Sequence, residues 1–151
     1  MPAERFQPHA RGLIDTNIII LRHAVDASLL PEEVGISAVT LAELSAGPHL
    51  VQGIGPEADA ERARRVAVLQ HTESEFDPLP FDADAARMFG RISAAVRASG
   101  RSPRSRVADL MIAAVAASVD LPLYTTNPDD FAGLDGLDGL VDVVAVPRPE
   151  I

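Results

Sequence analysis

The sequence predicts one α/β domain with three layers, in which helices cover both faces of a central, mostly parallel sheet. Short apolar runs that end in turns alternate along the chain with longer segments of helical periodicity. This alternation favours parallel strands joined by helices that cross the sheet. The chain has 151 residues, 47% of them hydrophobic, which is enough for one domain with a sizeable core. We expect residues 12–147 to form that domain and residues 1–11 and 148–151 to be tails.

Five segments are predicted to be strands because they are short, apolar and bounded by turn residues. They are residues 12–15, 34–37, 76–81, 121–126 and 141–146. The segment 76–81 contains two prolines, which lack the N–H that a sheet needs, so we expect an edge or irregular strand there. The short Leu-Asp-Gly duplication in residues 134–140 is predicted to be a turn-rich connector before the last strand.

The helices are predicted from apolar spacing and from their end signals. Residues 82–99 form an amphipathic pattern, and residues 107–119 are apolar almost all round, as expected for a helix packed at the centre of the domain. The other predicted helices are residues 18–25, a helix that starts at Ser37 or Thr40 and ends near Gly47, residues 60–71, and a short turn around Phe131.

The composition excludes several kinds of chemistry. No cysteine is present, which rules out disulfides, zinc-thiolate sites and thiol nucleophiles. All 13 basic residues are arginine. The absence of lysine excludes Schiff-base enzymes and P-loop NTPases, because both need a lysine side chain. The four histidines have no metal-ligand spacing, so we expect them to be ordinary surface or core residues.

Charge and hydropathy limit the binding partners. A net charge of -9 argues against a protein that coats nucleic acid without specificity, so any RNA binding must be local or mediated by a metal ion. The same acidic surface would suit a basic protein partner or would simply favour solubility. The longest apolar run, residues 110–117, is much shorter than a membrane span. We expect a soluble, cytoplasmic protein that does not bind membranes.

Three acidic residues, Asp15, Glu43 and Asp109, occupy positions where a globular protein would rather not place a charge. Each also has a structural explanation. Asp15 ends an apolar strand and would cap the next helix. Glu43 lies three residues after Thr40, which is a capping-box spacing. Asp109 would lie in a first helical turn, where the helix dipole favours an anion.

Taken together, the same acids predict a metal site. Strands of an open parallel sheet end in one crevice, so acids that follow different strands can meet there. Asp109 has apolar neighbours and needs a cation or good hydrogen-bond donors. Gathered carboxylates select a hard divalent ion, Mg²⁺ or Mn²⁺. Such an ion can hold a phosphodiester and activate water, so hydrolysis would need no lysine, cysteine or catalytic histidine.

Four segments in this order resemble a known family. They are Leu13–Asn17 (LIDTN), Ile36–Leu44 (ISAVTLAEL), Val107–Ala114 (VADLMIAA) and Leu123–Phe131 (LYTTNPDDF). The chain is similar to the PIN-domain ribonucleases and, within them, to the VapC toxins of bacterial VapBC toxin-antitoxin pairs, from about Gly12 to Val146.

The resemblance implies a PIN-like fold and a Mg²⁺- or Mn²⁺-dependent endoribonuclease that hydrolyses RNA phosphodiester bonds. Asp15, Glu43 and Asp109 would be the catalytic, metal-binding acids, and the hydroxyl groups of Thr16, Ser37 and Thr126 would orient them. Relatives often have an aspartate where this chain has Asn127 and another just before the phenylalanine. The remaining metal ligands would therefore be Asn127 and Asp130, with Asp129 as an open alternative.

The family likeness also implies partners. These are RNA as substrate, a cognate VapB-type antitoxin and a second copy of the chain in a homodimer. Arg104 and Arg106, just before the helix that carries Asp109, are candidates to guide the RNA backbone, although such a loop is often only a solvated connector. Two other functions stay open: a catalytically silent PIN-like module that binds a protein, which the neutral Asn127 favours, and a structure-specific DNA nuclease.

Overall fold

The computed structural model describes residues 9–132 and 140–150. Within these residues, four parallel strands form one sheet in the order β2-β1-β3-β4. The strands are β1 (Arg11–Ile14), β2 (Glu33–Gly35), β3 (Leu123–Thr125) and β4 (Val143–Ala145). The predicted α/β class with a central parallel sheet is confirmed. Most of the connector predicted at 134–140 lies outside the described residues.

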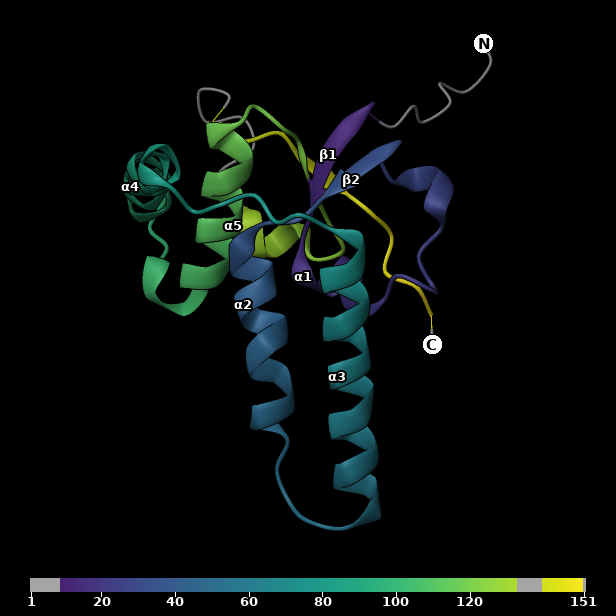
Figure 1. Cartoon of the computed structure of the whole chain (residues 1–151). Helices are drawn as coiled ribbons and strands as arrows, with labels where there is room; N and C mark the ends of the chain where they lie inside the picture. The colour runs from purple at the N-terminus through teal and green to yellow at the C-terminus, as the bar shows by residue number, and fades with distance from the viewer. Residues whose placement is uncertain (1–8, 133–139, 151) are drawn as a thin grey trace.

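Helices lie on both faces of this sheet, and α2 and α3 run side by side away from it (Figure 1). The α-helices are α1 (Thr16–Ile20), α2 (Ala38–Ala46), α3 (Pro56–Glu75), α4 (Ala83–Ala98) and α5 (Val107–Ser118). Short 3-10 turns are η1 (Ala27–Leu29), η2 (Gly47–Leu50), η3 (Pro103–Arg106) and η4 (Pro128–Phe131). No helix in the described ranges is long and apolar enough to cross a membrane.

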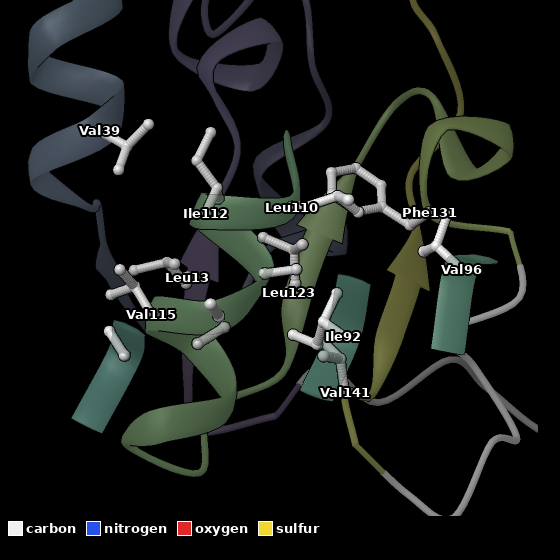
Figure 2. Packing of buried hydrophobic residues seen from close by; sticks show 14 residues of the cluster. Leu13, Val39, Ile92, Val96, Leu110, Ile112, Val115, Leu123, Phe131 and Val141 are labelled. Carbon is white, nitrogen blue, oxygen red and sulfur yellow. The ribbon is translucent and has the colours of Figure 1, made fainter. Parts of the chain in front are cut away.

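The two faces of the sheet belong to two hydrophobic clusters, because successive strand residues point to opposite sides. Leu13 and Leu123 pack with the buried residues of α4 and α5, including Ile92 and Ile112 (Figure 2). Their chain neighbours Ile14 and Tyr124 belong to the second cluster, which contains residues of α1, α2 and α3. Helix α1, which Asp15 precedes, and helices α2 and α5, which carry Glu43 and Asp109, are therefore all anchored in the core.

The segment 76–81 is not a strand of the sheet, so that prediction was wrong. Only Leu79 pairs, in a single parallel bridge with Ser37. Its N–H donates to the carbonyl of Ile36 at 2.9 Å, and its carbonyl accepts from the N–H of Ala38 at 2.8 Å. Pro78 and Pro80 flank it, and the pairing cannot continue because prolines have no N–H to donate.

The strand order locates the crevice of the sheet. The chain passes from β1 to β2 on one side and later from β3 to β4 on the other, so the order reverses between β1 and β3. Ligands of open α/β sheets bind at this switch point, beyond the carboxyl ends of the strands. Asp15 directly follows β1, and Thr125 ends β3.

Candidate metal centre

Asp15 lies at the junction between β1 and α1 and is buried. It caps α1, because its Oδ1 accepts the backbone N–H of Ile18 at 3.0 Å. Its other oxygen, Oδ2, accepts a hydrogen bond from the hydroxyl of Thr125. A carboxylate has about four lone-pair positions, so two bonds leave acceptor capacity for a cation.

The pairing of β1 with β3 brings Thr125 to Asp15. Ile14 and Tyr124 are register partners, so the residues that follow them emerge side by side. The Thr125 oxygen also accepts the backbone N–H of Asn127 at 3.0 Å. The Thr125 hydroxyl therefore connects Asp15, which follows β1, with the turn that leads into η4.

Glu43 is not part of a helix cap. The N-cap of α2 is Ser37, whose hydroxyl oxygen accepts the N–H of Thr40 at 3.1 Å. The capping-box explanation for Glu43 required Thr40 at that position, and it is excluded. Instead, Glu43 Oε1 accepts from the hydroxyl of Thr16 at 2.7 Å, and the Thr16 oxygen also lies 3.1 Å from that of Thr40. Thr16 thus ties α1 to the carboxylate on α2.

Asp109 lies in the first turn of α5, a helix whose buried residues include Leu110 and Ile112. The pKa of the Asp109 carboxyl is raised to about 6, mainly by burial and then by the nearby charges of Asp130, Glu43 and Asp15, while Arg106 acts in the opposite direction. The pKa of Asp15 is raised too, mainly by burial and against its hydrogen bonds to Thr125 and Ile18. The carboxylates of Glu43 and Asp130 are therefore close enough to Asp15 and Asp109 for their negative charges to raise both pKa values.

A cleft of about 550 Å³ opens between α1, α2, α3 and α5. Asp15, Glu43 and Asp109 all line it. The other lining residues are Thr16, Asn17, Ile20, Leu44, Gly47, Glu61, Arg64, Arg65 and Val68. Acids that are 28 and 66 positions apart in the sequence therefore face one cavity.

The donor chemistry of this cleft fits a hydrated divalent cation. Within residues 9–132 and 140–150, no three acidic or histidine side chains stand close enough to enclose one ion by themselves. Mg²⁺ does not need such a cage, because it keeps several of its waters and is commonly held by one or two carboxylates. Burial and the neighbouring carboxylates raise the pKa of Asp109, and a cation beside it would favour its ionised form.

The profile of the PIN domain matches residues 12–137, which is more than half of the chain. The chain belongs to the PIN-domain family. It is 42% identical, over 130 residues, to Ribonuclease VapC5 of Mycobacterium tuberculosis, an alignment that covers 84% of this chain and 90% of that protein.

Solved structures of PIN-domain relatives give the same assignment. The crystal structure of VapBC-5 from M. tuberculosis, a member of the VapBC family of toxin-antitoxin systems, superposes with a TM-score of 0.76 at 40% identity and covers 91% of this chain and 99% of that chain. The crystal structure of DNA-bound VapBC from Salmonella typhimurium has a TM-score of 0.61 at 25% identity, covering 89% of this chain and 97% of that chain.

The PIN domain brings most of the predicted site residues together, but the hydroxyls of Ser37, which bonds to Thr40, and of Thr126 contact none of the acids among the described residues. Asp130 lies close enough to raise the pKa values of Asp15 and Asp109. Asn127 takes part through its backbone N–H. The expected role of Thr126 was wrong: its buried hydroxyl has no hydrogen-bond partner among the described residues, and Thr125 contacts Asp15 instead. A shift of one residue along a strand turns a side chain to the opposite face.

The arginines before α5 have a structural contact that the sequence did not indicate. Arg106 Nη1 donates to the carbonyl groups of Asp129 and Asp130, at 3.2 and 3.1 Å. Arg101 Nη1 also reaches the Asp129 carbonyl, at 3.4 Å. Arg106 therefore holds the η4 turn beside Asp109, while Arg104 is exposed.

Sequence reasoning missed the contribution of α3 to the cleft. Glu61, Arg64 and Arg65 line it, although the segment reads as an ordinary charged surface helix. One available signal was Pro56, which occupies the start of α3 and, with Glu57 in the first turn, marks a helix start earlier than residue 60.

Proposed function

We propose that this PIN domain is a divalent-metal-dependent endoribonuclease that hydrolyses RNA phosphodiester bonds, with Mg²⁺ or Mn²⁺ as the ion. The observation that carries the proposal is the convergence of Asp15, Glu43 and Asp109 on one cleft. The likeness to Ribonuclease VapC5 supports RNA as the substrate. When bound, a divalent ion would hold the phosphodiester and lower the pKa of the attacking water.

The chain's own residues prepare the carboxylates for this task. Thr125 and the N–H of Ile18 fix the two oxygens of Asp15, so the orientation of its free lone pairs is set before the ion arrives. Thr16 holds Glu43 on the neighbouring helix. Asp109 and Asp130 add negative charge. The residues proposed to hold the hydrated ion, directly or through its waters, are Asp15, Glu43, Asp109 and Asp130, with Asn127 adjoining them.

In the cell, we assign the chain the role of a bacterial cytoplasmic toxin that a VapB-type antitoxin restrains, in a complex that contains a homodimer of the PIN domain. The likeness to the VapBC-5 toxin-antitoxin structure supports this assignment. Arg104, exposed beside the turn that Arg106 holds, stays a prediction as an RNA contact.

The test is RNA cleavage by purified protein with Mg²⁺, with Mn²⁺ and with EDTA, comparing the parent with Asp15→Asn and Asp109→Asn. Asp84→Asn is the matched control, because Asp84 is an exposed acid on α4 that pairs with Arg87. We expect cleavage that needs the ion and falls by at least about 100-fold in both site variants, since charge stabilisation of this kind is worth several kcal/mol.

Two results would contradict the proposal. Cleavage that persists in EDTA would contradict the proposed dependence on a divalent metal ion. A well-folded parent that cleaves no RNA with either ion, but binds the antitoxin, would favour the silent protein-binding module instead.

A further inference from the structure

Two arginines of α3, Arg64 and Arg65, line the same cleft as the acids. Both pair with one carboxylate, that of Glu61, whose pKa they hold below its usual range. Val68, one helical turn beyond Arg64, lines the cleft too and packs against the second core cluster. A helix that is anchored in the core therefore carries both arginines at the wall of the acidic cleft.

The two arginines are held very differently. Arg65 has a structural role, because its Nε donates to Glu61 Oε1 at 2.9 Å and its Nη1 to the carbonyl of Gly47 at 2.8 Å. It ties α3 to the end of α2. Arg64 donates only to Glu61 Oε2, from Nε at 3.0 Å and from Nη2 at 2.6 Å, among its side-chain bonds to the described residues. Its side chain is 67% exposed.

We propose that Arg64 binds a backbone phosphate of the RNA next to the scissile bond, an inference that rests on the proposed ribonuclease function. A guanidinium presents two parallel N–H groups that match phosphate oxygens. Arg64 already uses such a pair of donors on Glu61. A phosphate that enters the cleft can replace the Glu61 carboxylate at Arg64.

This exchange leaves no charge without a partner. When Arg64 turns to a phosphate, Glu61 keeps its bond to Arg65, which stays anchored on Gly47. Freeing Arg64 also costs little, because solvent-exposed ion pairs contribute little to stability. Glu61 therefore acts as a placeholder that keeps the Arg64 side chain at the cleft until the substrate arrives.

The charge of the chain makes such a local contact necessary. A protein with a net charge of -9 repels RNA over most of its surface, and the cleft itself holds three acids besides Glu61. Phosphate contacts through arginine supply most of the affinity of a protein for a nucleic acid backbone. An arginine in the wall of the acidic cleft supplies that contact where the reaction takes place.

The experiment measures binding of short, single-stranded, fluorescein-labelled RNA of random sequence, by anisotropy over a series of NaCl concentrations. The full chain carries Asp15→Asn so that the RNA stays intact. Arg64→Ala and Arg64→Lys are compared with Arg87→Ala, the matched control. Arg87 is also an exposed arginine paired with an acid three residues earlier, but it lies on α4, outside the cleft.

We expect Arg64→Ala to weaken RNA binding roughly three- to tenfold and to reduce the slope of log K against log salt by about 0.7, the value for one phosphate contact on a single strand. Arg64→Lys should restore the slope but not the full affinity, because lysine keeps the charge and loses the fork. Arg87→Ala should change neither quantity. Unfolding in urea checks that all variants remain folded.

Equal affinity and equal salt slope for Arg64→Ala and its parent would overturn the inference and leave the ribonuclease proposal intact. A polyglutamate peptide whose binding falls in Arg64→Ala, while RNA binding does not, would overturn it in favour of an acidic protein partner. If the chain with all its acids cleaves no RNA and the Asp15→Asn chain binds none, the ribonuclease proposal fails and this inference fails with it.

Discussion

The adjacent threonines Thr125 and Thr126 provide a matched test of how the site is held. Both are buried. The Thr125 hydroxyl donates to Asp15 and accepts the N–H of Asn127 at 3.0 Å. The Thr126 hydroxyl has no partner in the described part of the chain. Threonine to valine keeps the shape and replaces the hydroxyl with a methyl group, so the two substitutions differ only in what the hydroxyl was doing.

At position 125, valine leaves an oxygen of the buried Asp15 carboxylate without its donor. A hydrogen bond to a charged group contributes about 1.5 to 3 kcal/mol, and the loss of the acceptor for the Asn127 N–H adds to this. The buried methyl group offsets about 0.8 kcal/mol. We therefore expect Thr125→Val to lower the free energy of unfolding by about 2 kcal/mol and to reduce RNA cleavage, because Asp15 loses its orientation.

At position 126, the same substitution removes a polar group that is buried without a bond. Its desolvation is unfavourable, so we expect Thr126→Val to leave the free energy of unfolding unchanged or to raise it by up to about 1 kcal/mol. Urea denaturation at pH 7 in EDTA measures both variants against the parent. If Thr126→Val is as destabilising as Thr125→Val, the hydrogen-bond assignment is wrong, and the assignment of Thr125 as the residue that orients Asp15 has to be withdrawn.

Two further predictions concern stability. In the metal-free protein, Asp109→Asn should stabilise by roughly 1 to 2 kcal/mol at pH 7: a pKa raised from 3.8 to about 6 corresponds to at most about 3 kcal/mol, which partial exposure reduces. Because the folded state holds this proton more tightly, the parent loses stability as pH rises from about 4 to 6, so urea midpoints of parent and variant should converge near pH 4 and separate above it. Gly12→Ala should destabilise by about 1 to 3 kcal/mol, because its Cβ would lie 2.7 Å from the buried Tyr124 ring. Gly90→Ala on α4, where a Cβ meets nothing within 4 Å, should stabilise by about 0.5 to 1 kcal/mol, and equal midpoints for the two alanine variants would contradict this account of packing.

The parts of the fold that the sequence predicted are those with a strong local signal. The all-round apolar pattern of residues 107–119 gave α5 within one residue of its end. The spacing of Ala85, Ile92 and Val96 gave α4 to within one residue at each end. Each pattern lies within one continuous segment, so it can be read without the rest of the chain.

The parts that failed depend on register between distant segments. Whether Thr125 or Thr126 faces Asp15 is decided by the pairing of Ile14 with Tyr124, and no local pattern carries that information. The strand prediction for residues 76–81 failed for a related reason. The segment has strand-like residues, but the prolines beside Leu79 limit it to one bridge.

Asp15 caps α1 and is also a proposed metal ligand, and this double role decides which variant tests the site. Its Oδ1 caps α1, so alanine would remove the cap together with the charge. Asparagine is an equally good cap, and its side-chain oxygen can still accept the N–H of Ile18. The Thr125 hydroxyl, which rotates freely, can accept from the new amide instead of donating to a carboxylate. Asp15→Asn therefore keeps the helix start and removes only the negative charge, so a loss of cleavage in this variant reports on the metal site and not on the fold.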